Sequence, residues 1–218
     1  MIDAVVFDLD GVIVDSEQVW DEVRERYARE RGGAYGPSAA RDMMGMSAPE
    51  WSRYMVETVC VPGPPERVVA DVLARMLVRY GDQPPLLPGA VEAVRRVGTR
   101  WPIAIASSSN PELIEVVLRV AGLAPLVGVA VSSQEVPRGK PAPDVYVEAA
   151  RRLDVDPARA AAVEDSHNGI RSAKAAGLSV VAIPNAHFPP DDEALALADR
   201  QLSSIGNLFP TLGVENRF

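Results

Sequence analysis

Cysteine is almost absent from this 218-residue sequence. Cys60 is the only one, so no disulfide can form within the chain, and we expect a buried and unreactive thiol. Long apolar runs are also absent, and the first residues lack the basic and then apolar pattern of a secretory signal. We therefore expect no membrane span and a cytoplasmic location.

Positive charge is in short supply. The formal net charge is −8, which argues against nucleic acid as a partner, because binding to phosphate backbones needs a basic face. Lysine is scarcer still, since Lys140 and Lys174 are the only lysines among 22 basic residues. With 47% hydrophobic residues the composition is that of a globular protein, and nothing in it indicates an obligate interface, so we expect a monomer.

Short, continuously apolar segments recur along the chain and alternate with helical patterns. Continuous rather than alternating apolar character is typical of parallel strands that are buried on both faces. The expected strands are residues 4–7, 101–109, 126–133, 160–166 and 178–184. The expected helices between them are residues 89–98, 111–121, 143–153 and 168–176. This order predicts an α/β fold with a doubly wound parallel sheet.

The segment from residue 15 to residue 86 breaks this alternation. It contains two stretches with apolar residues at helical spacing, around Val19 to Tyr27 and around Val68 to Met76, and no comparable apolar strand. We expect a helical domain at residues 15–86, inserted into an α/β core of residues 1–14 and 87–218. The last 30 or so residues have no strong period, and only a final helix and a loose tail are expected there.

Polar side chains follow four of the five expected strands. In an open α/β sheet the ligand site lies at the carboxyl ends of the strands. The residues at these ends are Asp8 and Asp10, Ser107 to Ser109, Lys140, and Glu164 with Asp165. Each group alone has an ordinary explanation as a turn, a cap or a surface residue. Together, four carboxylates in one crevice would repel one another unless a cation lay among them, and Mg²⁺ is the ion that prefers such oxygen ligands beside a phosphate.

Four motifs in this order resemble the haloacid dehalogenase-like (HAD) superfamily. They are "VVFDLDGV", a serine at the end of the next strand, "KPAPDVY" and "VEDSHNGI", and they extend from residue 4 to residue 170. The sequence is most similar to the branch of phosphatases and β-phosphoglucomutases, in which a helical cap is inserted after the first motif. The resemblance implies a Rossmann-like core and an enzyme that acts on a small phosphorylated metabolite.

The resemblance also implies roles for the acidic residues. Asp8 would attack phosphorus and form an aspartyl-phosphate, and Asp10 would protonate the leaving oxygen and then activate water. Mg²⁺ would be held by the Asp8 carboxylate, the Asp10 backbone carbonyl and Asp165. Glu164 would be a further metal ligand or a support for the others.

Three further residues would bind the phosphate in this reading. Ser107 would donate a hydrogen bond to the transferred phosphoryl group, and Lys140 would supply a compact positive charge. Ser108 would contribute its backbone amide.

Two alternatives to a phosphatase remain open at this stage. A sugar-phosphate mutase shares the fold and the motifs, but such mutases place a histidine near the position of Trp20 and basic residues where this chain has Met44 and Ala48. Hydrolysis is therefore the preferred reading. A receiver-type phosphoacceptor, which is not an enzyme, combines similar residues on a doubly wound sheet, but in a different motif order and without an inserted helical domain.

Overall fold

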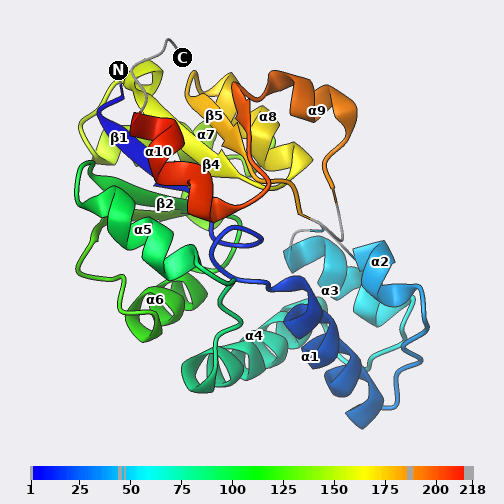
Figure 1. The fold of residues 1–218 in the computed structure, drawn as a ribbon. Helices are drawn as coiled ribbons and strands as arrows, with labels where there is room; N and C mark the ends of the chain where they lie inside the picture. Colours follow the sequence, from blue (N-terminus) through cyan, green and yellow to red (C-terminus); the bar gives the residue numbers. More distant parts are fainter. Residues whose placement is uncertain (1, 44–45, 47, 186–188, 214–218) are drawn as a thin grey trace. The chain divides into compact units, whose positions relative to one another are not determined.

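The computed structural model describes residues 2–43, 46, 48–185 and 189–213. Two compact units make up the chain, Met1–Asp15 with Leu86–Phe218 and Ser16–Pro85 (Figure 1). Within the described residues, no helix combines the length and the apolar character that a membrane crossing requires.

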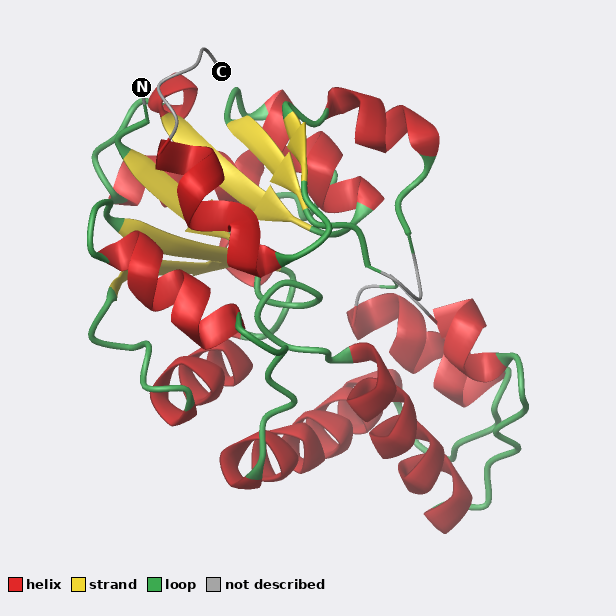
Figure 2. Ribbon diagram, in the orientation of Figure 1, coloured by secondary structure: helices red, strands yellow, loops and turns green. Residues whose placement is uncertain are grey.

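The first unit is built on a six-stranded sheet whose strand pairs are all parallel, in the order β3-β2-β1-β4-β5-β6 (Figure 2). The first five strands are almost wholly apolar, and the two central ones are buried along their whole length. The strands are β1 (Ala4–Phe7), β2 (Ile103–Ser107), β3 (Val127–Ser132), β4 (Ala160–Glu164), β5 (Ser179–Ala182) and β6 (Arg200–Gln201).

Helices cover both faces of this sheet. Alternate strand residues such as Val6 and Ala162 pack on one face against α7 and α8, in a core that includes Tyr146 and Ile170. Helices α5 and α10 lie over the opposite face (Figure 1). The helices of this unit are α5 (Ala90–Gly98), α6 (Pro111–Val120), α7 (Asp144–Arg152), α8 (His167–Ala175), α9 (Asp192–Leu197) and α10 (Leu208–Gly213).

Helices are the only regular elements in the described part of the second unit. Its helices are α1 (Glu17–Glu30), α2 (Ala39–Met43), α3 (Ala48–Glu57) and α4 (Pro65–Asp82). Among the apolar residues at helical spacing, Tyr27 on α1 and Val68, Val72 and Met76 on α4 are fully buried. Others in the same pattern, such as Val23 and Leu73, are half-buried. The packing of this unit therefore follows from the helical periodicity of the sequence.

The prediction of the α/β fold with a doubly wound parallel sheet is confirmed, and the five predicted strands are β1 to β5. The prediction for Cys60 is wrong, because this residue is exposed. It lies in the turn after α3 with φ 61, in the left-handed region, and the turn directs it to solvent. Met44, one of the two positions at which sugar-phosphate mutases were expected to carry a basic residue, lies outside the described residues.

Candidate active site

Asp8 is the first residue after β1, and the sheet fixes its position. Its backbone N–H still donates to the Val163 carbonyl of β4, at 3.0 Å, so the ladder continues one residue beyond the strand. The chain then turns, because the amides of Ile13 and Val14 both donate back to the Leu9 carbonyl. Leu9 is fully buried beneath this turn. Asp8 is therefore held on the central strands, where the backbone has little freedom.

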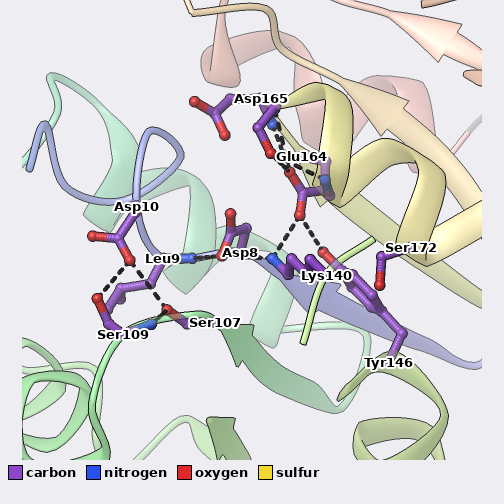
Figure 3. A network of polar contacts seen from close by, with 12 residues as sticks. Asp8, Leu9, Asp10, Ser107, Ser109, Lys140, Tyr146, Glu164, Asp165 and Ser172 are labelled. Atoms are coloured by element: carbon purple, nitrogen blue, oxygen red, sulfur yellow. Dashed lines mark hydrogen bonds and ion pairs between the residues drawn. The ribbon is translucent and has the colours of Figure 1, made fainter. Parts of the chain in front are cut away.

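Lys140 and three carboxylates meet at this end of the sheet (Figure 3). The Lys140 Nζ lies 3.0 Å from Asp8 Oδ1 and 2.7 Å from Glu164 Oε1. Only 5% of the Lys140 side chain is exposed, and Glu164 is fully buried. Asp165, the next residue, is also buried, so one lysine lies among three carboxylates that water hardly reaches.

Glu164 binds more groups than any other member of this cluster. Its Oε1 accepts hydrogen bonds from Lys140 and from the hydroxyl of Tyr146, each at 2.7 Å. Its Oε2 accepts from the backbone amides of Asp165 and Ser166 and from the Ser166 hydroxyl. Since both oxygens are fully used, Glu164 fits the role of a support that holds Lys140 in place.

The excess of buried negative charge is visible in the pKa values. Burial, reinforced by the charge of Glu164, raises the pKa of Asp8 well above its ordinary value and raises the pKa of Asp165 to about 8. Burial acts to lower the pKa of Lys140, but the carboxylates of Asp8 and Glu164 outweigh it and raise that pKa. The lysine therefore stays charged, yet it offsets only part of the negative charge around it.

The same cluster is suited to a divalent cation. One carboxylate oxygen each from Asp8, Glu164 and Asp165 can be chosen so that all three lie within 4.8 Å of one another. Among the described residues, Asp165 accepts only a long 3.5 Å hydrogen bond, from the amide of Asn185. Asp8 and Asp165 thus have oxygens to spare, and a hard cation between them would offset the uncompensated charge.

The Asp10 carboxylate lies in a separate group of hydroxyls (Figure 3). Its Oδ2 accepts hydrogen bonds from the hydroxyls of Ser107, at 3.1 Å, and Ser109, at 2.8 Å. Its Oδ1 is buried and has no partner among the described residues. Ser109 is itself held by Ser132, whose hydroxyl donates to the Ser109 carbonyl at 2.7 Å. Asp10 is therefore oriented by the end of β2, with one oxygen left without a donor.

The structure brings together most of the residues that the sequence indicated. Asp8, Lys140, Glu164 and Asp165 form the first group, and Asp10 with Ser107 forms the second. Ser108 is exposed. The role expected for it belongs to its backbone amide, and that role stays a prediction.

Sequence reasoning placed Ser109 at the end of its strand but gave it no role, and it missed Tyr146 and Asn185. The period of two along an extended segment was a usable signal for Ser109, because it repeats the direction of Ser107. No pattern distinguishes Tyr146 from an ordinary core residue of an amphipathic helix.

Two glycines make room for the acidic side chains. Gly11 has φ +77, and an added Cβ there would lie 1.8 Å from Asp165 Oδ2. An added Cβ at Gly169, on α8, would lie 1.8 to 2.0 Å from the carboxyl atoms of Glu164. These distances are shorter than any non-bonded contact, so the carboxylates occupy space that only glycine leaves free.

Gly169→Ala is expected to lower the free energy of unfolding by about 2 kcal/mol and to reduce activity, since the buried Glu164 carboxylate must give up hydrogen bonds to Lys140 and Tyr146. Urea unfolding and initial rates measure the two effects. Gly81→Ala on α4 is the matched control, because no atom lies within 4 Å of its added Cβ. Equal stability and activity for both variants would contradict this view of Glu164.

Comparison with known proteins places this arrangement in a family. The model of the haloacid dehalogenase-like hydrolases matches residues 2–177. Hexitol phosphatase B of Escherichia coli K12 is 32% identical over 212 residues, which are 94% of this chain and 93% of that protein.

Solved structures agree with this assignment. CbbY from Rhodobacter sphaeroides, in complex with phosphate, superposes with a TM-score of 0.84 at 26% identity and covers 95% of this chain and 96% of its own. A β-phosphoglucomutase-like protein from Thermotoga maritima superposes with a TM-score of 0.79 at 28% identity. The match covers 97% of this chain and 98% of that protein's chain. The chain belongs to the haloacid dehalogenase-like hydrolase family and is an enzyme of its phosphatase and β-phosphoglucomutase branch.

Proposed function

We propose that this enzyme is a Mg²⁺-dependent phosphatase that hydrolyses a small phosphorylated metabolite through an aspartyl-phosphate on Asp8. The observation that supports this most is the contact between a buried carboxylate and a buried ammonium at the end of β1, with Asp8 Oδ1 and Lys140 Nζ 3.0 Å apart. The fixed positive charge of Lys140 would attract the oxygens of a phosphate dianion. The neighbouring carboxylate of Asp8 would then be in position to attack phosphorus.

In the first step, an oxygen of Asp8 would form a bond to phosphorus as the bond from phosphorus to the leaving oxygen breaks. The leaving oxygen takes that electron pair and a proton from the carboxyl group of Asp10. The unpartnered Oδ1 of Asp10 is the oxygen free to carry that proton to the substrate, while Oδ2 keeps its hydrogen bonds from Ser107 and Ser109.

In the second step, Asp10 would take a proton from water as the water oxygen attacks phosphorus, which releases inorganic phosphate and restores Asp8. Lys140 would hold the phosphoryl oxygens in both steps, and Glu164 would hold Lys140. Mg²⁺, bound through Asp8, Asp165 and the Asp10 carbonyl, would neutralise charge on the phosphate and so reduce its repulsion by Asp8.

The substrate class follows from the relatives rather than from the geometry of the core. Hexitol phosphatase B is named for a phosphorylated sugar alcohol, and we extend this to small phosphorylated sugars or polyols as substrates of this chain. We propose that the inserted helical unit, Ser16–Pro85, is the cap that selects among them.

Phosphate release is the direct test of this proposal. The purified chain with Mg²⁺ is expected to release inorganic phosphate from at least one member of a panel of hexitol phosphates, hexose phosphates, nucleotides and phosphoglycolate. Addition of EDTA should remove the activity and excess Mg²⁺ should restore it, because the carboxylate cluster would otherwise face the phosphate uncompensated. Activity that survives EDTA would contradict the role of the metal.

A mutase is the second candidate, on account of the β-phosphoglucomutase-like structural neighbour. The same panel separates the two functions. Conversion of a hexose 1-phosphate to the 6-phosphate without release of phosphate would establish the mutase and overturn the phosphatase.

A further inference from the structure

Ser132, the last residue of the edge strand β3, is a fully buried serine. It lies beside Ser107, the last residue of β2, in the register of these two parallel strands. Its hydroxyl accepts a hydrogen bond from the backbone amide of Gln134 at 3.1 Å and donates one to the backbone carbonyl of Ser109 at 2.7 Å. A buried hydroxyl that both donates and accepts has a fixed orientation, so Ser132 connects β3 firmly to the segment that follows β2.

Capping of the next turn explains only part of this arrangement. Ser132 precedes a short 3-10 helix, Ser133–Glu135, and forms a capping box with Glu135, whose Oε2 accepts a hydrogen bond from the Ser132 amide at 2.8 Å. A capping serine has to accept a hydrogen bond from the backbone and does not have to donate one. The proton of the Ser132 hydroxyl is therefore not needed for the cap, and it is directed to Ser109, 23 residues earlier in the chain.

Ser109 in turn contacts the Asp10 carboxylate (Figure 3). Its hydroxyl donates to Asp10 Oδ2 at 2.8 Å, and its backbone amide donates to the Ser107 hydroxyl at 3.0 Å. Ser132 holds the carbonyl of Ser109 while Ser107 holds its amide, so the direction of the Ser109 hydroxyl is set from both sides. A path of hydrogen bonds through Ser109 therefore leads from Ser132 to Asp10.

The surroundings of Ser132 make it a rigid support. Glu135, which binds the Ser132 amide, also accepts hydrogen bonds from the guanidinium of Arg152, each at 3.2 Å. Because no part of Ser132 is exposed, its side chain cannot touch a substrate. Any effect of Ser132 on the reaction has to pass through a neighbour, and Ser109 is the neighbour that contacts a proposed catalytic group.

We propose that Ser132 is a positioning residue for proton transfer by Asp10. It acts through Ser109, which binds Oδ2 of Asp10 and leaves Oδ1 to give its proton to the leaving oxygen as the bond from phosphorus to that oxygen breaks. Proton transfer depends strongly on position, and a displacement of about 1 Å can cost about 100-fold in rate. This inference rests on the proposed phosphatase function and adds to it a residue that does not touch the substrate.

Substrates with different leaving groups test the inference. An alkyl phosphate that the wild type hydrolyses has a leaving oxygen that needs a proton, whereas acetyl phosphate releases acetate, which needs none. In Ser132→Ala, kcat/KM is expected to fall by about 10- to 100-fold for the alkyl phosphate and to change little for acetyl phosphate. Transfer to Asp8 with loss of the leaving group is the last step that this parameter reports, so the later action of Asp10 as a base does not enter it.

Ser133→Ala is the matched control, because it makes the same change at the next residue. The Ser133 hydroxyl is buried and has no hydrogen-bond partner among the described residues, so its removal should leave both kcat/KM values unchanged. An equal fall for both substrates in Ser132→Ala, or no fall for either, would overturn the inference and leave the phosphatase proposal standing. Release of no phosphate by the wild type, from the panel or from acetyl phosphate, would overturn both.

A double-mutant cycle tests whether Ser132 acts through Ser109. Ser109→Ala removes the hydroxyl that contacts Asp10, and with the alkyl phosphate it is expected to lose at least as much activity as Ser132→Ala. The double variant should lose no more than Ser109→Ala alone, because the path to Asp10 is already broken. Losses that multiply would show that the two serines act independently and would refute the proposal.

Thermal unfolding separates positioning from a purely structural role. Ser132→Ala is expected to lower the midpoint by about 2 to 8 °C, because the buried Ser109 carbonyl loses a hydrogen bond. The ratio of the two kcat/KM values does not depend on how much of the protein is folded, so a loss of stability alone cannot change it. A lower midpoint with an unchanged ratio would identify Ser132 as structural only and contradict the inference.

Discussion

Replacement of Asp8 by asparagine is expected to lower kcat by about 10,000-fold or more, the size of effect seen when a nucleophile is removed. Asparagine has the shape of the carboxylate but lacks the charge and the oxygen that would attack phosphorus. The fold should survive, because the change removes one of three mutually repelling buried charges and leaves Lys140 paired with Glu164. Steady-state phosphate release and thermal unfolding together measure the result.

Asp3→Asn provides the control for this experiment. Asp3 immediately precedes β1, but it pairs with Arg159 at the opposite end of the strand from Asp8. The same chemical change there should leave kcat unaltered and have little effect on stability, as expected for a surface ion pair. Full turnover in Asp8→Asn would exclude Asp8 as the nucleophile and, with it, the proposed mechanism.

Replacement of Lys140 by methionine is expected to have the largest effect on stability. Lys140 is the only cation in direct contact with the described carboxylates of the cluster, so its removal leaves Asp8, Glu164 and Asp165 buried without compensation. Loss of one partner from a buried ion pair costs about 3 to 5 kcal/mol. Activity should fall by about 100- to 1,000-fold as well, since the phosphoryl oxygens lose a fixed positive charge.

Mg²⁺ should restore part of the stability of Lys140→Met, because its charge then replaces the positive charge that the cluster has lost. The other lysine of the chain provides the control. Lys174 on α8 pairs with Asp199 at 2.9 Å and is more than a third exposed, so Lys174→Met should lose less than about 1 kcal/mol and remain active. Equal losses of stability and activity in the two lysine variants would contradict the proposal that Lys140 compensates the buried carboxylates.

The sequence predicted the core of the site because parallel strands bring their carboxyl ends together. Asp8 and Glu164 are far apart in sequence, yet β1 and β4 are hydrogen-bonded neighbours, and Phe7 is opposite Val163 in the register. Any chain that places acids directly after two adjacent strands must therefore bring them close. Lys140 could be singled out because lysine is rare in this chain.

Strand geometry was a poorer guide to Asp10. Residues i and i+2 point the same way only in an extended segment, but β1 ends at Phe7, and the chain turns at Gly11, which has φ +77. The Asp10 carboxylate therefore meets Ser107 and Ser109 in a group of its own. Turn geometry of this kind depends on hydrogen bonds that no local pattern encodes.

Arg24, a buried residue of α1, shows a second limit of sequence reasoning. An arginine on an amphipathic helix is normally read as a solvated residue, and its burial depends on how α1 and α3 pack around Trp20 and Trp51. The two-residue strand β6 was missed for a simpler reason, because it is too short to show any period. The expected monomer and the cytoplasmic location remain predictions.

The central claim, that Asp8 carries the phosphoryl group, can be tested by acid quench. The Asp10→Asn variant is incubated with Mg²⁺ and acetyl phosphate, quenched in acid, digested and analysed by peptide mass spectrometry. Acetyl phosphate is an activated donor that needs no proton for its leaving group, whereas release of the intermediate needs the base at Asp10. The account predicts one added phosphoryl group on the peptide that contains Asp8 and none when Asp8 is also changed to asparagine. Phosphate bound covalently at another residue, or turnover of a good substrate by the wild type with no trapped adduct in either protein, would contradict it.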